Sequence, residues 1–309
     1  MENYQLLVGD RVKHATRTDW GLGQVLSTEV NNEVEILFED VGDIKKFNLS
    51  FAKFIQVTGD EATSDYLTAL VKRFRENALA PKSTNKKAAA TTSFPKAVDN
   101  FLSIFPEGFR DPSYLAGKTG EREYKLAANR LMMELLGKDA FKGVLESGDF
   151  KEICNRAKSV INKTNLIHTY EKIWLNNALA TENNQNVFAF GLFDLLYGEN
   201  AQQSRFEKFA AMLYEINAAK WPIATYFLFI RFPESQIFVK PQVTQNAAEV
   251  LGMSINYRPE LNWLTYSQVL NLAQNLKTKL EKTDNPTLLP EDMIDVQSFI
   301  WVTAPSYYS

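Results

Sequence analysis

The spacing of hydrophobic residues divides the chain into a short β-rich part and a long helical part. In NNEVEILFED, residues 31–40, Val34, Ile36 and Phe38 occupy alternate positions, with Glu33, Glu35 and Glu39 on the outward face. A period of two is that of a strand with one buried face, and Asn, Gly and Asp between such runs favour hairpin turns. Several short strands in so few residues predict a small closed β-barrel over residues 1–60.

From residue 98 onward the apolar residues recur at helical spacing. In EREYKLAANRLMMELLG, residues 121–137, we expect Tyr124, Ala128, Leu131 and Leu135 to share the buried face, and the final glycine is a helix-ending signal. Similar segments continue to the C-terminus and predict an all-α domain over residues 98–309. The expected fold class is therefore α+β with the two classes in separate domains.

Residues 61–97 connect these two domains. Helical spacing at the start of this segment is followed by APKSTNKKAAATTS, which has no large apolar residue and cannot bury enough surface to order itself. We expect a helix and then a flexible basic linker, in which Lys82, Lys86 and Lys87 are candidate contacts to DNA phosphates. The alternative is a tether that serves only solubility.

Charge and composition narrow the function classes. The net charge is −3, but residues 1–60 carry −4, residues 61–97 carry +4 and residues 98–309 carry −3, so positive charge is concentrated in the linker. One cysteine and two histidines exclude a disulfide framework and argue against a protein zinc site or a His-based triad, so neither metal nor cofactor is expected.

The sequence also shows no targeting signal. No apolar run reaches the length of a membrane span, and no charged segment followed by an apolar one forms a signal peptide. The sequence therefore predicts a cytoplasmic protein without a membrane partner.

The stretch VGDRVKHATRTDWGLGQV, residues 8–25, resembles the Tudor- or SH3-like modules appended to bacterial DNA helicases and repair factors. The resemblance implies a docking surface, with Trp20 and His14 near its exposed end. Because this part of the chain is acidic, we expect a protein partner rather than direct phosphate contact. The alternative is a structural barrel without a function of its own.

Residues 220–252 read KWPIATYFLFIRFPESQIFVKPQVTQNAAEVLG and resemble the core of the helix-hairpin-helix DNA glycosylases. That core has a GVGxKTA hairpin, a hydrophobic helix, an FGxP turn and a VDTHV segment that opens the next helix with a catalytic aspartate. Ala224 falls on the alanine of KTA, and VKPQV lies over VDTHV. Lys240 therefore occupies the aspartate position, and Ala218, Lys220 and Pro222 replace residues of the hairpin.

This resemblance implies removal of a base from DNA, which builds oxocarbenium character at the sugar C1′. An enzyme stabilises that charge with a carboxylate or attacks C1′ with an amine. Lys240 is the candidate amine if apolar neighbours desolvate it; alternatively it contacts the DNA or lies in solvent ahead of Pro241. Asp295, in an apolar run, is the first carboxylate candidate, and Asp111, in a loop rich in Gly and Pro, is the second.

Basic and aromatic residues complete the candidate site. Such residues suit phosphate contact and base stacking, although the aromatic ones equally suit packing on the core. The candidate DNA contacts here are Lys220 and Arg258, and the candidate stacking residues are Trp221, Tyr257, Trp263 and Tyr114.

The function that we expect from the sequence is excision of a modified or damaged base from double-stranded DNA by cleavage of the N-glycosidic bond, with the base flipped out. Defence against phages that carry bulky modified bases is one hypothesis for its role. The rival interpretations are a non-catalytic DNA-binding adaptor and a transcription- or repair-associated protein whose barrel binds a protein partner.

Overall fold

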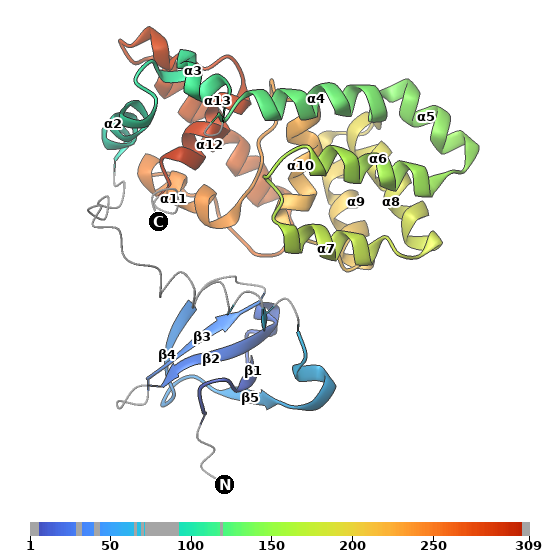
Figure 1. Cartoon of the computed structure of the whole chain (residues 1–309), viewed down its shortest axis with the longest axis vertical. Helices are drawn as coiled ribbons and strands as arrows, with labels where there is room; N and C mark the ends of the chain where they lie inside the picture. The colour runs from blue at the N-terminus through green and yellow to red at the C-terminus, as the bar shows by residue number, and fades with distance from the viewer. Residues whose placement is uncertain are drawn as a thin grey trace. The chain divides into compact units, whose positions relative to one another are not determined.

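A computed structural model of the chain describes residues 6–28, 33–39, 44–64, 67–68, 71, 93–117 and 120–304. The chain divides into two compact units, Met1–Lys86 and Lys87–Ser309, drawn in Figure 1. The first holds an antiparallel sheet and the second is helical, so the predicted fold class is confirmed. The candidate DNA contacts Lys82, Lys86 and Lys87 lie outside the described residues.

The strands of the first unit form one antiparallel sheet. Along β2 and β3, Val25 lies opposite Ile36, and along β1 and β2, Val12 lies opposite Gly23. The sheet order is β4-β3-β2-β1-β5, with β1 Arg11–His14, β2 Leu22–Thr28, β3 Glu33–Phe38, β4 Ile44–Asn48 and β5 Phe54–Val57.

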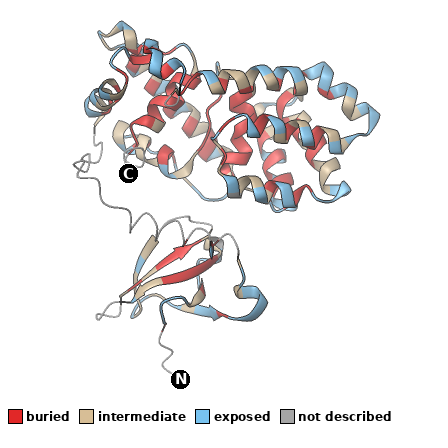
Figure 2. Ribbon diagram, viewed as in Figure 1, coloured by how far each residue is buried: buried red, intermediate tan, exposed pale blue. Residues whose placement is uncertain are grey.

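The two outer strands curl toward each other, since the rings of Phe47 on β4 and Phe54 on β5 lie 5.1 Å apart. Inside the curl, Val34, Ile36 and Phe38 are fully buried, as their alternation predicts. Gly23 fits there because a side chain would come within 2.7 Å of the Phe38 ring. The sheet thus wraps around a core as a small barrel does (Figure 2).

A second apolar cluster covers the other side of part of the sheet. Leu37, which alternation places outward, is fully buried with Leu22 and Val57 against Leu67 and Val71. The segment that follows the barrel therefore packs on it, and strand alternation alone could not predict this second core.

The second unit is an assembly of helices around one continuous core. The first described helix of this unit begins at Phe94. No helix among the described residues is long and apolar enough to cross a bilayer. The helices are α2 Phe94–Ile104, α3 Pro112–Leu115, α4 Glu123–Leu136, α5 Lys138–Ser147, α6 Phe150–Asn162, α7 Thr169–Ala178, α8 Glu182–Tyr197, α9 Gln202–Glu215, α10 Trp221–Arg231, α11 Pro241–Leu251, α12 Trp263–Glu281 and α13 Met293–Val302.

Helix α10 lies at the centre of this domain (Figures 1 and 2). Its residues from Trp221 to Ile230 are all buried, which explains the unbroken apolar run in the sequence. A five-residue turn, 216–220, connects it to α9, and Asn217 takes the left-handed conformation there with φ 57°. This turn between α9 and α10 lies at the place where the resemblance predicted a hairpin.

The buried face of α4 differs from the predicted one. The residues that point into the core are Lys125, Ala128, Met132 and Leu136, whereas Tyr124, Leu131 and Leu135 are only half-buried. The helix is rotated relative to the predicted orientation. One of its core positions holds a lysine, which a pattern of apolar residues cannot predict.

Candidate functional site

The three predicted catalytic residues do not share one site. Lys240 lies at the start of α11 and pairs with a residue of α7, whereas Asp295 belongs to a buried polar network on α13. Asp111 lies near that network, because it precedes α3, which carries Tyr114.

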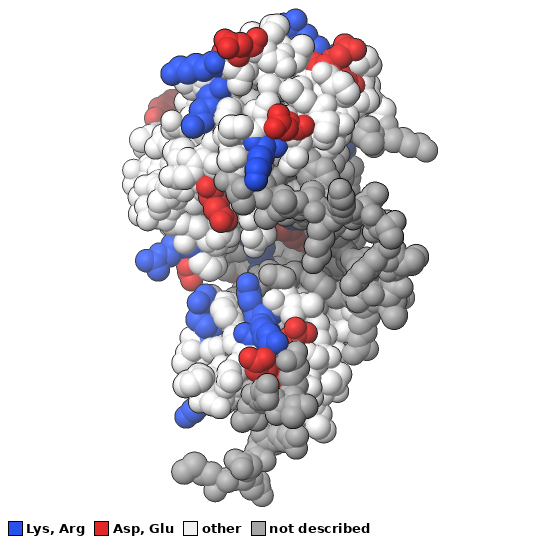
Figure 3. Space-filling view, turned by 90° about the vertical axis from the view of Figure 1, so that its left-hand side faces the viewer, with Lys and Arg blue, Asp and Glu red and all other residues white. Residues whose placement is uncertain are grey.

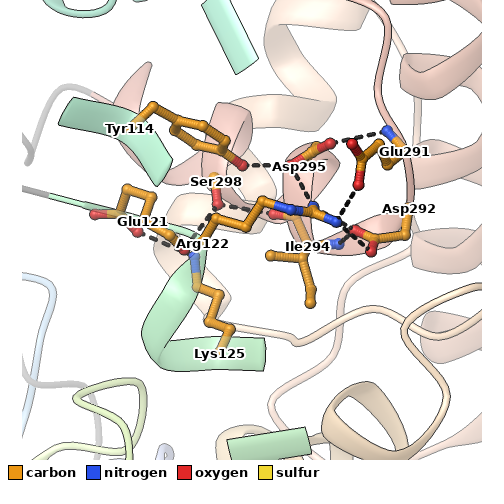
Figure 4. A network of polar contacts seen from close by, with 9 residues as sticks. All are labelled: Tyr114, Glu121, Arg122, Lys125, Glu291, Asp292, Ile294, Asp295 and Ser298. Atoms are coloured by element: carbon orange, nitrogen blue, oxygen red, sulfur yellow. Dashed lines mark hydrogen bonds and ion pairs between the residues drawn. The ribbon is translucent and has the colours of Figure 1, made fainter. Parts of the chain in front are cut away.

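The network around Asp295 connects α3 and α4 to α13 (Figure 4). Its carboxylate accepts from the Tyr114 hydroxyl at 2.5 Å, from Arg122 Nη1 at 2.6 Å and from the Glu291 backbone N–H at 2.8 Å. Arg122 also binds Asp292. Residues about 170 positions apart in the sequence are thereby joined, and every oxygen of Asp295 has a protein donor.

Lys125 extends the same network as a fully buried cation. Its Nζ donates to Glu121 Oε2 at 3.0 Å and to Ser298 Oγ at 2.8 Å. Burial lowers the pKa of Lys125, and Glu121 opposes that shift. Burial likewise raises the pKa of Asp295, against the opposing charge of Arg122 and the hydrogen bond from Tyr114. The ions compensate one another, as buried charges must.

Asp111 and Tyr114 have structural roles in this region. The Asp111 carboxylate accepts from the Ser113 N–H at 2.9 Å and from the Glu107 N–H at 3.1 Å, so it caps α3. The Tyr114 ring is fully buried, so it has no face open to a base, contrary to its predicted stacking role.

Lys240 directly precedes α11 and follows Val239, which contacts α10. The backbone N–H of Val239 donates to Thr225 Oγ1 at 3.0 Å, and Thr225 in turn donates to the Trp221 carbonyl at 2.8 Å. Neither helix has a side-chain cap, and their preceding residues are Lys220 and Lys240. Each lysine therefore precedes a positive helix end, and both contact residues of α7.

Glu171 of α7 is the partner of Lys240. Its Oε2 accepts from Lys240 Nζ at 3.0 Å and from the His168 backbone N–H at 2.7 Å. About a quarter of each paired side chain is exposed, 26% for Lys240 and 23% for Glu171. One turn further along α7, the Trp174 ring lies 4.0 Å from Lys220 Nζ, a cation–π contact.

The other predicted aromatic residues form a packed group near the start of α12. Trp221 is 2% exposed, and its indole N–H donates to the Arg258 carbonyl at 2.9 Å. The Tyr257 ring lies 6.5 Å from that of Trp221, and burial raises the pKa of Tyr257 to about 12. Trp263 is half-buried against Tyr266. Packing on the core, the alternative for these aromatic residues, describes Trp221 best; the Arg258 side chain is exposed.

Glu171 and Trp174 were not predicted from the sequence. They belong to an ordinary helical segment, and only the tertiary fold brings Glu171 to a lysine 69 positions away. On the face of the helical domain in Figure 3, charges of both signs are interspersed, so phosphate attraction on this face would be local rather than spread over a broad basic surface.

Comparison with known proteins gives a match only within the β-sheet unit. A family model described as "Protein of unknown function (DUF3553)" matches residues 6–47, from Leu6 into β4. No curated protein and no solved structure matches the chain.

Proposed function

We propose that this protein is a DNA glycosylase-like enzyme that excises a modified or damaged base at the junction of α10, α11 and α7. The observation that carries the proposal is the Glu171 carboxylate, held 3.0 Å from Lys240 at the place where the resemblance to glycosylases puts a catalytic aspartate. Glu171 would do the work of that carboxylate.

The surroundings of this pair suit a DNA backbone. The N-terminal ends of α10 and α11 carry positive partial charge, which favours phosphate. Lys220 adds a full charge at the start of α10, after the turn from α9. Ala218 and Lys220 replace the hairpin glycines, so we expect contact through the lysine side chain in place of a close backbone approach.

The chemistry that we propose is hydrolysis of the bond between C1′ and the base. The electron pair of that bond leaves with the base, positive charge develops at the sugar, and the Glu171 carboxylate stabilises it. A water molecule then attacks C1′ and gives its proton to Glu171. Lys240 donates to Glu171 and holds its carboxylate in place.

The amine mechanism is the second version of the same activity. Lys240 would first pass a proton to Glu171 and then attack C1′ as the base leaves with the electron pair of its bond; opening of the C1′–O4′ bond of the sugar ring then gives the Schiff base. The ion pair makes Lys240 a donor in the resting protein, which favours the hydrolytic version. We assign the carboxylate role to Glu171 instead of Asp295 or Asp111, because the Glu171 side chain is 23% exposed beside Lys240, whereas Asp295 is buried and Asp111 caps α3.

A flipped base needs an aromatic or apolar surface. Trp174 is the candidate in place of the buried Trp221 and Tyr114, because it is half-buried one turn from Glu171. Bulky modified bases, such as those of some phage genomes, remain our hypothesis for the substrate. The non-catalytic adaptor is the rival function, and it predicts DNA binding without base release.

The test is incubation of the full chain with duplexes that carry uracil, alkylated bases, 5-hydroxymethylcytosine or its glucosylated form, followed by alkali and gel electrophoresis. We expect strand breaks at the modified position of at least one duplex. Failure to release a base from any modified DNA, with DNA binding retained, would support the adaptor. Borohydride trapping separates the two mechanisms, since only the amine version leaves a covalent adduct.

A further inference from the structure

The barrel carries an open hollow of about 430 Å³ between the end of β1 and the β4–β5 turn. Its lining includes the ring residues His14 and Phe47 and the lysines Lys46 and Lys53, and Lys46 Nζ lies 2.9 Å from Glu33 Oε2 of β3. The His14 ring packs 5.0 Å from Trp20 and 5.2 Å from Phe54, so the aromatic wall is supported by the core beneath it.

The β4–β5 turn holds Phe51 out into solvent. The Phe51 side chain lines the hollow and is 90% exposed, the largest exposed fraction of the large apolar residues described. Asn48 fixes the turn: its Oδ1 accepts from the Ser50 N–H at 2.9 Å and its carbonyl accepts from the Phe51 N–H at 3.0 Å. A turn fixed in this way lowers the backbone ordering cost of binding.

The other side of the hollow is fixed as well. His14 Nδ1 accepts from the backbone N–H groups of Thr16 at 3.2 Å and Arg17 at 3.1 Å, and the Ala15 N–H donates to the Lys53 carbonyl at 3.0 Å. The end of β1 and the β4–β5 turn are thus joined by the backbone, and the hollow is a built feature of the fold.

Basic and acidic residues of this unit occupy different stretches of the sequence. Residues 1–60 hold six Lys and Arg against ten Asp and Glu, yet all six cations lie within residues 11–17 and 44–54 and none of the ten acids does. These are the two stretches that line the hollow. The two stretches are therefore basic in sequence, although Lys46 pairs with Glu33 and Lys13 with Glu61 in space, and this local charge changes the expectation of a protein partner drawn from net charge.

We propose that this hollow binds single-stranded nucleic acid. A base stacks on Phe51 and enters the space beside His14 and Phe47, and the flanking phosphates contact Lys46 and Lys53. Stacking on an exposed ring requires an unpaired base, because the faces of bases in a duplex are covered by their neighbours. An acidic peptide would use the lysines but would leave the presented ring unexplained.

This site is separate from the proposed glycosylase site. A protein that acts on one base and also holds a single strand could stay bound near opened or damaged DNA. The inference does not rest on the proposed function, because either site can fail without the other.

The test is fluorescence anisotropy of the full chain with a labelled thymidine oligonucleotide of about ten nucleotides. Phe51→Ala should weaken binding by about 5- to 100-fold, the range for loss of one base-stacking contact. Lys46→Gln with Lys53→Gln should lower the slope of log affinity against log salt by about 1.4, at about 0.7 for each lost phosphate contact.

Matched controls lie on the helical domain. Phe190→Ala removes another exposed ring, 52% exposed on α8, and Lys151→Gln removes an exposed lysine of α6; both should bind as the wild type does. Lys220→Gln with Lys240→Gln should also keep single-strand binding, which separates this site from the glycosylase site.

Three results would overturn the inference. They are no binding of the oligonucleotide by the wild type, equal binding by Phe51→Ala, and equally tight binding of a polyglutamate peptide of matched charge. Far-UV circular dichroism of Phe51→Ala serves as the folding check, and the high exposure of Phe51 predicts an unchanged spectrum.

Discussion

At the scale of single residues, the structure separates groups that hold the fold from groups open to a ligand. Lys125 is completely buried, whereas about a quarter of Lys240 is exposed. Both pair with a glutamate, Glu121 and Glu171 respectively. The Lys125–Glu121 pair, with side chains 1% and 11% exposed, is structural, whereas the Lys240–Glu171 pair is open enough to meet a substrate.

Removal of Lys125 tests its structural role. Lys125→Met leaves Glu121 without its cation in a buried place, and we expect a loss of about 3–5 kcal/mol in the free energy of unfolding. Urea unfolding followed by circular dichroism measures this. Glu121→Gln in the Lys125→Met background should recover part of the loss, whereas Lys277→Met, which breaks a more exposed pair with Glu281, should cost less than about 1 kcal/mol.

The capping carboxylate of Asp111 gives a dependence on pH. Its pKa is lowered, first by the hydrogen bond from the Ser113 side chain, so the unfolded chain binds more protons than the folded one between the two pKa values. The stability from Asp111 is therefore present above a pH of about 4, the ordinary Asp value, and is lost as the pH falls through the lowered value.

Asp111→Ala should cost about 1 kcal/mol at neutral pH, and the difference from the wild type should shrink in acid. Urea midpoints of both proteins from pH 7 downward measure this. A difference that stays constant at every pH would contradict the role that we give to the ionised cap.

At the scale of elements, Thr225 sets the position of α11 on α10. It is fully buried and accepts the Val239 N–H just before Lys240. Thr225→Val keeps the shape but removes the acceptor, so we expect a loss of about 1–3 kcal/mol and faster hydrogen exchange at the Val239 amide. Thr225→Ser keeps the hydroxyl and should retain slow exchange; equal exchange in both variants would count against this role.

How much the sequence predicts can be seen in these elements. The alternation of Val34, Ile36 and Phe38 predicts their strand because the signal lies in neighbouring residues. Gly137 predicts the end of α4 for the same reason. The burial of Leu37 and Lys125 does not follow the pattern, because each is buried by a segment that is distant in the sequence.

The candidate site was predictable only in part, for the same physical reason. The hydrophobic run and the start of α11 placed Lys240 correctly at a helix N-terminus. Its pairing with Glu171 depends on how α7 packs on α10, which no local signal in either segment encodes. Asp295 was predicted to be catalytic because it is a polar residue in an apolar run. In the structure it belongs to a buried polar network instead.

At the scale of the whole molecule, two compact units carry separate candidate sites. The sheet presents Phe51 beside Lys46 and Lys53, and the helical unit presents Glu171 and Lys240. The Asp295 network ties the first helices of the second unit to its last helix. The candidate glycosylase site, on α7, α10 and α11, therefore lies in a unit whose first and last helices are joined by hydrogen bonds.

The central claim is that Glu171 and Lys240 act together in base excision, and the most direct measurement is the single-turnover rate of base release from modified duplex DNA. Glu171→Gln and Lys240→Gln should each lower that rate by at least about 100-fold, while Lys151→Gln should leave it unchanged. Wild-type rates in both variants, or no base released by the wild type, would contradict the account.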